Sequence, residues 1–407
     1  MTEHTSTPEL RFPEFKEEWR EFNLKDISTK KSKKNKNKLY NETFTNSAEY
    51  GIVPQKDYFD KEISNVRNLS NYYIVDPDDF VYNPRISSLA PVGPINRNKL
   101  NRIGVMSPLY TVFSTKLSIK SFLEYYFKTT KWHKFMKLNG DSGARSDRFT
   151  IKQSLFVKMP IVLPSEQEQE KIGGFFSKLD RQIELEEKKL ELLEQQKKGY
   201  MQKIFSQELR FKDKKDNYYS DWKNCQLKDL TYYKNGKGYE KVATTNGKYN
   251  IINLNSIGIK GQLKNSGKYT DFEDDTLLKN DLIMILSDVA KGNLIGMTAI
   301  IDENNKYLLN QRIALLRIKN SLITNAYFLY LYINFNRKYF INMSAGMSQL
   351  NINKKTVEDF PVNLPNIEEQ NKIAILFKNY GDTIKKQASK VKLLKQRKQG
   401  LLQKMFV

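Results

Sequence analysis

Two long stretches of the chain, 166–206 and 367–407, carry hydrophobic residues at alternating intervals of four and three, with single polar interruptions. The recurring apolar positions are Ile172, Phe176, Leu179, Ile183, Leu190 and Leu193 in the first stretch, and Ile373, Phe377, Ile384, Val391, Leu394 and Leu401 in the second. This spacing places the side chains on one face of an α-helix and is typical of a coiled coil. Each stretch follows a Leu-Pro pair, which favours a helix boundary. The pattern therefore predicts two long helices.

The polar interruptions fall at the same two steps of both stretches, at Glu186 and Lys197 in the first and at Gln387 and Lys398 in the second. The first stretch has nearly equal numbers of acidic and basic residues, whereas the second is strongly basic. We expect the two helices to pair with each other, and to run antiparallel so that the domain between them is compact. The alternative is that the charges only mark solvated faces and that the helices pair with another protein.

The chain is an internal repeat with an offset of about 201 residues. Segment 192–205 shares eight of fourteen residues with segment 393–406, and Pro160–Pro164 corresponds to Pro361–Pro365. The starts of the two halves also correspond, because Leu-Arg-Phe, Trp and Leu-Lys-Asp recur in the same order at 10–26 and 209–229. Between these anchors the halves differ strongly. The sequence therefore predicts one frame that carries two different inserts.

The inserts have the composition of β-rich domains. Segments 39–127 and 228–333 contain short runs of Val, Ile, Tyr and Phe that are separated by Gly, Pro and Asn. Such runs are typical of strands. We therefore predict a mixed α/β (α+β) fold with an internal pseudo-twofold repeat, in which two similar globular domains are joined by the two helices. The predicted boundaries are 1–165, 166–206, 207–366 and 367–407.

The charge of the chain indicates what kind of partner it binds. The chain of 407 residues has a formal net charge of +22, which favours a polyanionic partner. Residues 80–140 hold ten basic residues and one acidic residue, and residues 304–357 hold eight basic residues and no acidic residue. These blocks lie at matching places of the repeat and are interleaved with aromatic and amide residues. Nucleic acid is therefore favoured over a membrane, which is expected to attract a basic amphipathic helix.

Scarce residue types exclude several classes of protein. With one cysteine and two histidines, the chain has no disulfide and no cysteine-based zinc site. Segment 1–9 is polar, unlike a signal peptide, and no apolar run is long enough for a membrane helix. We therefore expect a reduced, soluble protein of the cytoplasm.

The candidate DNA contacts lie in the two basic blocks and in two loops, 139–148 and 344–355, that are rich in small and polar residues. They are Arg85, Arg97, Lys99, Arg102, Arg145, Ser146 and Arg148 in the first half, and Arg312, Gln349, Asn351, Lys354 and Lys355 in the second. Arginine can bond guanine through two hydrogen bonds, and glutamine or asparagine can bond adenine in the same way. Such loops also serve as ordinary connectors, so this assignment is a hypothesis.

The motifs of three kinds of enzyme are missing. The chain has no Asn/Asp-Pro-Pro-aromatic motif or glycine-rich cofactor turn of a methyltransferase, and no Gly-Lys-Ser/Thr phosphate loop of an ATPase. Pro77-Asp78 is reminiscent of a nuclease motif, but no acidic residue lies between Asp79 and Glu124, so a nearby carboxylate to complete a metal site is missing. We therefore expect a non-catalytic protein with no metal site.

Several motifs resemble the specificity subunit of type I restriction-modification systems. They are the Leu-Pro-x-x-x-Glu-Gln-x-Lys-Ile helix starts at 163–172 and 364–373, the opening Pro8–Phe15 with Trp19, and Ser107–Phe113. The resemblance implies that 1–165 and 207–366 are target-recognition domains that each read one half of a bipartite, gapped DNA site. It implies that the helices form a spacer that docks two methyltransferase subunits acting on adenine N6. S-adenosylmethionine, ATP and magnesium then belong to methyltransferase and restriction subunits, and this chain carries no cofactor.

Two other functions stay open at this point. One is an autonomous bipartite DNA-binding protein, such as a repressor, that works without methyltransferase partners. The other is an enzyme whose catalytic centre has no familiar motif.

Overall fold

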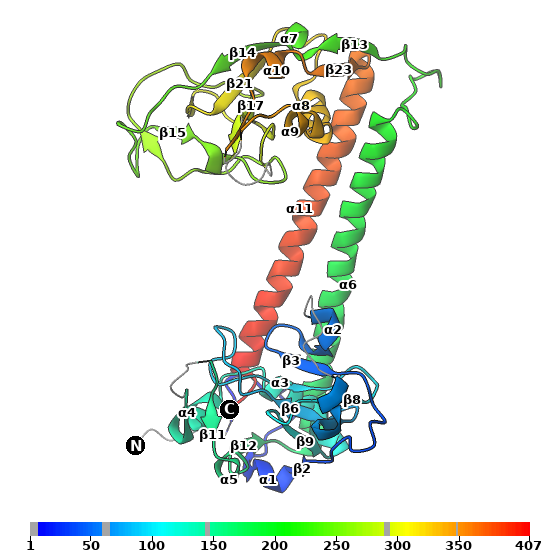
Figure 1. Ribbon diagram of the computed structural model, residues 1–407, viewed down its shortest axis with the longest axis vertical. Helices are drawn as coiled ribbons and strands as arrows, with labels where there is room; N and C mark the ends of the chain where they lie inside the picture. The colour runs from blue at the N-terminus through cyan, green and yellow to red at the C-terminus, as the bar shows by residue number, and fades with distance from the viewer. Residues whose placement is uncertain (1–6, 59–65, 143–146, 289–293, 347–348) are drawn as a thin grey trace. The chain divides into compact units, whose positions relative to one another are not determined.

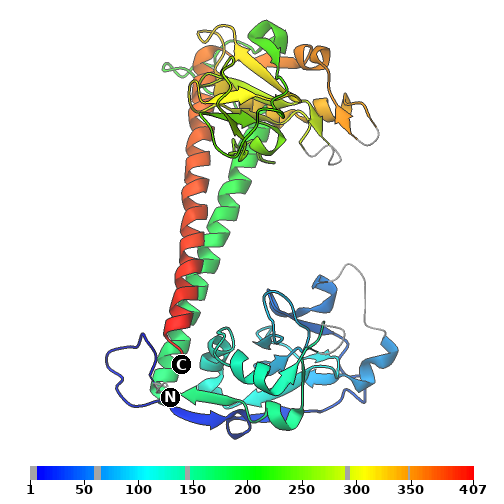
Figure 2. The same cartoon turned by 90° about the vertical axis from the view of Figure 1, so that its left-hand side faces the viewer.

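The computed structural model describes residues 7–58, 66–142, 147–288, 294–346 and 349–407. The chain forms two compact units, Met1–Lys188 with Ala388–Val407, and Lys189–Gln387. We call them unit 1 and unit 2. Each contains a mixed α/β part and segments of the two long helices α6 (Glu166–Phe205) and α11 (Ile367–Lys404) (Figure 1 and Figure 2). The predicted fold class is confirmed.

Both units contain a four-stranded antiparallel sheet of the same connectivity. In unit 1 the order is β2 (Ser28–Lys31), β9 (Thr111–Thr115), β6 (Phe80–Tyr82) and β7 (Ile95–Arg97). In unit 2 the order is β14 (Thr231–Asn235), β21 (Ile313–Ile318), β17 (Leu282–Ile285) and β19 (Thr298–Ile300). The two orders match strand by strand. The repeat therefore extends into the segments whose sequences differ most.

Short elements complete each unit. In unit 1 they are β1 (Arg20–Asn23), α1 (Leu24–Ile27), β3 (Phe44–Ser47), β4 (Gly51–Pro54), α2 (Gln55–Tyr58), β5 (Tyr73–Val75), β8 (Gly104–Met106), α3 (Lys120–Tyr126), α4 (His133–Asn139), β10 (Gly140–Asp141), β11 (Thr150–Ile151), α5 (Gln153–Phe156) and β12 (Pro160–Leu163). In unit 2 they are β13 (Lys223–Gln226), α7 (Leu227–Leu230), β15 (Tyr249–Ile252), β16 (Tyr269–Thr270), β18 (Ser287–Asp288), β20 (Tyr307–Leu309), α8 (Ala326–Phe335), α9 (Lys338–Asn342), β22 (Leu350–Asn351), α10 (Lys354–Glu358) and β23 (Pro361–Leu364).

The ends of the long helices are part of the globular cores. In unit 1 the ring of Phe406 lies 5.0 Å from that of Phe122 on α3 and 5.9 Å from that of Phe176 on α6. In unit 2 Phe205 takes the corresponding place, with its ring 6.1 Å from that of Phe328 and 6.4 Å from that of Phe377. Each core thus contains the start of one long helix and the last turn of the other. The amphipathic helices are stabilised by this burial.

The two helices are antiparallel within each unit. In unit 1 Lys390 pairs with Glu186 at 2.5 Å and Lys398 pairs with Asp180, so partner numbers fall on α6 as they rise on α11. Lys395 also pairs across the two helices, with Glu187 at 2.6 Å. In unit 2 the rings of Tyr200 and Tyr380 lie 5.9 Å apart. Of the predicted seam residues, Ile172, Phe176, Ile183, Ile373, Phe377 and Val391 are buried and Leu179, Leu190, Leu193, Ile384, Leu394 and Leu401 are half-buried. Helix pairing is therefore within the chain.

One buried ion pair joins the start of each repeat to its long helix. In unit 1 Arg11 donates to both carboxylate oxygens of Glu168, at 2.8 and 2.7 Å. In unit 2 Arg210 donates to both oxygens of Glu369, at 3.3 and 2.9 Å. Both glutamate side chains are fully buried. The recurring Leu-Arg-Phe and Glu-Gln motifs are therefore explained by one structural contact.

No helix of the described chain is both long enough and apolar enough to cross a membrane.

Glu168→Gln is expected to lower the free energy of unfolding of unit 1 by about 3 kcal/mol, because it leaves the Arg11 guanidinium largely buried without a countercharge. Urea denaturation followed by tryptophan fluorescence measures the change. Glu184→Gln is the control, since its ion pair with Arg181 on the same helix is mostly exposed and is expected to contribute less than about 1 kcal/mol. Equal shifts for both variants would contradict the structural role of the buried pair.

A second prediction concerns Asp79, which is buried at the turn before β6. Burial raises its pKa from 3.8 to about 6, against the opposing effects of the Asp76 N–H and of Lys31. The folded chain therefore keeps this proton to higher pH than the unfolded chain does. Between about pH 4 and about pH 6, rising pH should lower the melting temperature of the unsubstituted chain relative to that of Asp79→Asn. Above this range the difference between the two melting temperatures should stay constant. A difference that is independent of pH would contradict the raised pKa.

Candidate nucleic-acid interface

In unit 1 a hairpin lies beside the chain that leaves the central strand β6. Arg85 follows β6 and forms an antiparallel bridge with Arg148. The backbone N–H of Phe149 donates to the carbonyl of Pro84 at 2.7 Å, and β10 pairs with β11 to close the hairpin. The predicted loop 139–148 is therefore attached to the end of β6, and the backbones of Arg85 and Arg148 are neighbours.

Unit 2 repeats this arrangement with different residues. β18 follows the central strand β17 and pairs with β22, so that Ser287 lies opposite Asn351. Asn351 also bridges to Ala345, which closes the hairpin 345–351. In both units a short helix precedes the hairpin, α4 in unit 1 and α9 in unit 2. The two predicted loops thus occupy equivalent positions of the repeat.

Three of the candidates in unit 2 converge at this hairpin. The Gln349 side chain donates to the Ser287 hydroxyl, and the exposed Asn351 side chain donates to the Gln349 carbonyl at 3.1 Å. The carbonyl of Arg312 accepts from the N–H of Leu286 at 2.9 Å, immediately before Ser287. Arg312 is exposed and has a φ of 70°. The backbone of Arg312 therefore lies beside the residue that precedes Ser287, and the Gln349 and Asn351 amides lie at the hairpin that pairs with Ser287.

Lys354 and Lys355 begin α10 directly after the hairpin. The Asn353 side chain accepts from the N–H of Thr356 at 2.8 Å and caps this helix. Lys354 lies 3.5 Å from Glu358, whereas Lys355 is exposed, with no acidic partner within ion-pair distance among the described residues. The two ammonium groups are suited to phosphate contacts beside the hairpin.

The other three basic candidates of unit 1 lie at the opposite end of β6. Arg97 pairs across the sheet with Phe80, the first residue of β6, and its guanidinium bridges Asp78 at 3.1 Å and Glu124 at 2.5 Å. Lys99 also pairs with Glu124 at 3.0 Å. These cations are held by acidic groups of the same unit. The structure therefore separates them from Arg85 and Arg148.

Arg102 is tied in a similar way, because its guanidinium donates to both oxygens of Glu42 at 2.7 and 2.9 Å. Glu124 is the centre of the larger cluster. Burial raises the pKa of Glu124, but Lys128, Arg97 and Lys99 outweigh this effect and hold the pKa below its usual value. For Arg97, Lys99 and Arg102 the geometry therefore supports a structural role. Arg145 and Ser146 lie outside the described residues.

A buried amide network supports the candidate site of unit 1 and was missed in the sequence. The Asn46 side chain donates to the carbonyl of Val81 at 2.6 Å, and the Asn83 side chain donates to the carbonyl of Asn46 at 2.8 Å. The Asn83 side-chain oxygen accepts from the N–H of Arg85 at 2.9 Å. These bonds fix the chain as it leaves β6. The signal was the Asn83-Pro84 pair after an apolar strand.

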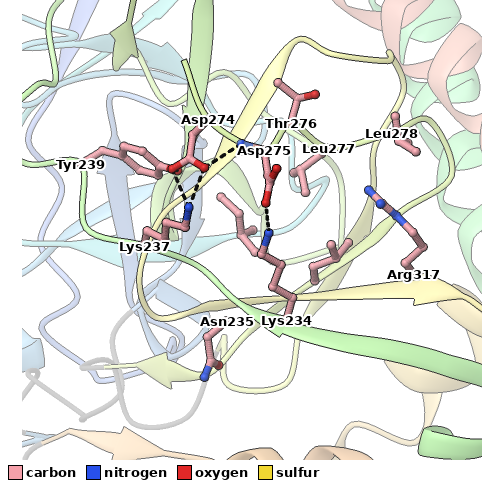
Figure 3. A pocket seen from close by; sticks show the side chains of 12 residues that line it. Lys234, Asn235, Lys237, Tyr239, Asp274, Asp275, Thr276, Leu277, Leu278 and Arg317 are labelled. Atoms are coloured by element: carbon pink, nitrogen blue, oxygen red, sulfur yellow. Dashed lines mark hydrogen bonds and ion pairs between the residues drawn. The ribbon is translucent and has the colours of Figure 1, made fainter. Parts of the chain in front are cut away.

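Unit 2 also has a charged hollow of about 350 Å³ beside β14, shown in Figure 3. Lys237 pairs with Asp274 at 2.6 Å and Lys234 pairs with Asp275 at 2.6 Å. The Lys237 hydrogen bond, with that from the Asp275 N–H, lowers the pKa of Asp274 to about 2. The acids neutralise the bases, so this hollow is a poor anion site. Among the described residues, no three His, Cys, Asp or Glu side chains are grouped to hold a metal ion.

The family model and the similar proteins that match this chain all belong to type I restriction systems. The family described as "Type I restriction modification DNA specificity domain" matches residues 16–195 and 219–395. A type I restriction enzyme MjaVIII specificity subunit from Methanocaldococcus jannaschii is 22% identical over 292 residues, which cover 69% of this chain and 65% of the relative. A putative type I restriction enzyme MjaX specificity subunit of the same organism is 24% identical and covers 58% of this chain and 55% of that protein. The matches thus span somewhat less than two thirds of each relative.

Solved structures share the fold. The crystal structure of a type-I restriction-modification system S subunit from M. genitalium has a TM-score of 0.58 at 15% identity and covers 98% of this chain and 99% of that chain. A chain from a structure of a type I R-M system, solved to explain complex assembly and conformational transition, has a TM-score of 0.57 at 15% identity, with the same coverage.

The two groups of arginines in unit 1 are expected to respond differently to substitution. Arg97→Ala should destabilise unit 1 by about 3 kcal/mol, because it removes a partner of the buried Glu124. Arg85→Ala should change stability by less than about 0.5 kcal/mol and weaken DNA binding. Urea denaturation and fluorescence anisotropy with duplex DNA measure the two effects. A destabilised Arg85→Ala chain with unchanged DNA affinity would contradict this division.

Proposed function

Because the chain belongs to the family of type I restriction-modification DNA specificity proteins, we propose that it selects the DNA sequence on which a type I restriction-modification complex acts. The observation that carries this proposal is the duplicated hairpin. Each unit has the same sheet order and the same hairpin position, but the side chains at the hairpin differ. A common frame with different reading residues suits a protein that recognises two different half-sites.

Unit 1 and unit 2 are assigned one half-site each. In unit 1 Arg85 and Arg148 reach guanine edges, since a guanidinium can donate two hydrogen bonds to O6 and N7. In unit 2 Gln349 and Asn351 provide amides that suit adenine, and Arg312 provides a second guanidinium beside them. Lys354 and Lys355 contact phosphates, which positions the hairpin without specifying a base. The two positive blocks supply the nonspecific attraction to the duplex.

The chemistry of the complex is assigned to partner subunits. Two methyltransferase subunits dock on the long helices and methylate adenine N6 with S-adenosylmethionine, and restriction subunits use ATP and magnesium. This chain is then a non-catalytic component that acts in the cytoplasm. An autonomous DNA-binding protein is the alternative function, and membership in the specificity family does not favour it.

The test is to map methylated adenines in the DNA of a host that expresses this chain together with its methyltransferase. A gapped, bipartite motif is the expected result. Arg148→Ala should then relax the half-site read by unit 1 at one position, with a loss of about 1–3 kcal/mol against the wrong base. Gln349→Ala should relax the other half-site only.

Lys355→Ala is the matched control, because loss of a phosphate contact should weaken binding to all sequences about equally and reduce the salt dependence. If Arg148→Ala and Lys355→Ala behaved alike, Arg148 would be a phosphate contact. If exchanging 207–366 for the segment of a relative altered both half-sites, the assignment of one half-site to each unit would fail.

A further inference from the structure

Unit 1 has a hollow of about 750 Å³ between its first strand and the start of α6. Trp19, Phe22 and Ile119 provide apolar parts of its lining, and Gln169 and Pro164 line it where α6 begins. The hollow lies apart from the hairpin assigned to DNA, since none of its lining residues belongs to segment 140–151.

Two buried polar atoms of this lining have no hydrogen-bond partner among the residues that the structure describes. They are the indole N–H of Trp19 and the side-chain oxygen of Gln169. Trp19 is 3% exposed and Gln169 is 4% exposed. An unpaired donor and an unpaired acceptor, both withdrawn from water, each cost about 1–3 kcal/mol. Such a pair is expected to have a partner in the working state of the protein.

The counterparts of these atoms in unit 2 are satisfied by the chain itself. The indole N–H of Trp222 donates to Glu369 at 3.2 Å. The side-chain oxygen of Gln370 accepts from the N–H of Asn325 at 2.9 Å. Both glutamines donate to the carbonyl of the preceding proline in the same way, at 2.7 Å in unit 1 and 2.8 Å in unit 2. The two units therefore share the backbone arrangement, but the tryptophan N–H and the glutamine oxygen have hydrogen-bond partners in the described chain only in unit 2.

The difference at the glutamine is explained by the segment that connects the sheet to the next helix. In unit 2 residues 319–325 connect β21 to α8 and bring the N–H of Asn325 to Gln370. In unit 1 the shorter segment 116–119 connects β9 to α3, and the N–H of Ile119 donates to the carbonyl of Lys116 instead. The shorter connection provides no N–H donor to the Gln169 side-chain oxygen. The hollow is thus a specific feature of the first repeat.

The rim of the hollow is acidic. Glu17, Glu18, Asp26 and Glu166 line it, against Arg20 and Lys116. This is a local excess of negative charge in a chain whose net charge is +22, so it repels a nucleic acid and attracts a basic group. A ligand that satisfies both buried atoms must accept a hydrogen bond from the Trp19 indole N–H and donate one to the Gln169 side-chain oxygen. A peptide backbone does both, and a flanking lysine or arginine suits the rim.

We propose that this hollow binds a basic peptide segment of a methyltransferase subunit, with the backbone bonded to Trp19 and Gln169. The inference rests on the proposed function, which supplies the methyltransferase. It adds that the two methyltransferase copies bind unequally, because the described part of unit 2 fills the equivalent positions with its own chain. One copy is therefore held by a contact that the other lacks.

The test uses the full chain and the purified methyltransferase subunit of its system. Trp19→Phe removes the indole N–H while it keeps an aromatic ring against Phe122, whose ring lies 5.8 Å from that of Trp19. Glu17→Gln with Glu18→Gln removes rim charge at exposed positions. Glu21→Gln is the matched control, since it lies on the same strand β1 but does not line the hollow. Native mass spectrometry gives the stoichiometry, and titration calorimetry gives the affinity of each copy.

The expected result is a loss of roughly tenfold in the affinity of one methyltransferase copy for each hollow variant, with the second copy and Glu21→Gln unchanged. DNA binding by the chain alone should stay unchanged in all variants. Unchanged binding of both copies would overturn the proposal and leave water as the partner of the buried pair. Altered self-association of the chain would also overturn it, in favour of a second copy.

Failure of the proposed function would look different. If the unsubstituted chain bound no methyltransferase, the proposed function and this inference would both fail. If it bound two copies and the hollow variants did so equally well, only the inference would fail. Trp222→Phe gives a further comparison, because it breaks an internal hydrogen bond and should lower stability rather than the affinity of one copy.

Discussion

A buried carboxylate near the start of each long helix is the constraint on which both units depend. Glu168 and Glu369 have no exposed side-chain surface, so each must be neutralised by a cation inside the protein. The cation comes from the beginning of the repeat, Arg11 in unit 1 and Arg210 in unit 2. This contact fixes the first residues of each repeat against the helix that ends it. The first and last strands then pair, β1 with β12 and β13 with β23.

Once these ends are joined, the segment between them can vary. The sheet order and the two hairpin positions are the same in both units, although the hairpin sequences have little in common. The hairpin of unit 2 illustrates the reason. It is attached through the backbone at Ser287 and Asn351, and its side chains contribute little to the core. Backbone pairing does not depend on side-chain identity, so a reading residue can change while the frame persists.

The sequence was sufficient for the features that are local or duplicated. The seam from Ile172 to Leu193 was predictable because helical periodicity is a property of neighbouring residues. The repeat placed Arg11 and Arg210 at corresponding positions, and the structure shows that both bind a buried glutamate. The charge blocks were a poorer guide to the site. Arg97 and Arg102 stand in a nearly acid-free segment, but Asp78 and Glu42, which lie before that segment, pair with them. A count along the chain does not include partners that only folding brings near. The Asn83-Pro84 pair marked the end of β6 in the sequence, but its hydrogen bond with Asn46 could not be predicted, for the same reason.

The differences between equivalent positions carry information that neither repeat carries alone. A tryptophan and a Glu-Gln pair recur in both halves, so either half by itself suggests only a structural motif. In unit 2 the motif is complete, since Trp222 and Gln370 both find partners within the chain. In unit 1 the same residues are buried, and Trp19 and Gln169 each keep one polar atom without a partner in the described part of the chain. The satisfied copy thus defines what the unsatisfied copy lacks, a group that accepts one hydrogen bond and donates another. A duplicated fold in this way supplies its own reference for finding where a partner belongs.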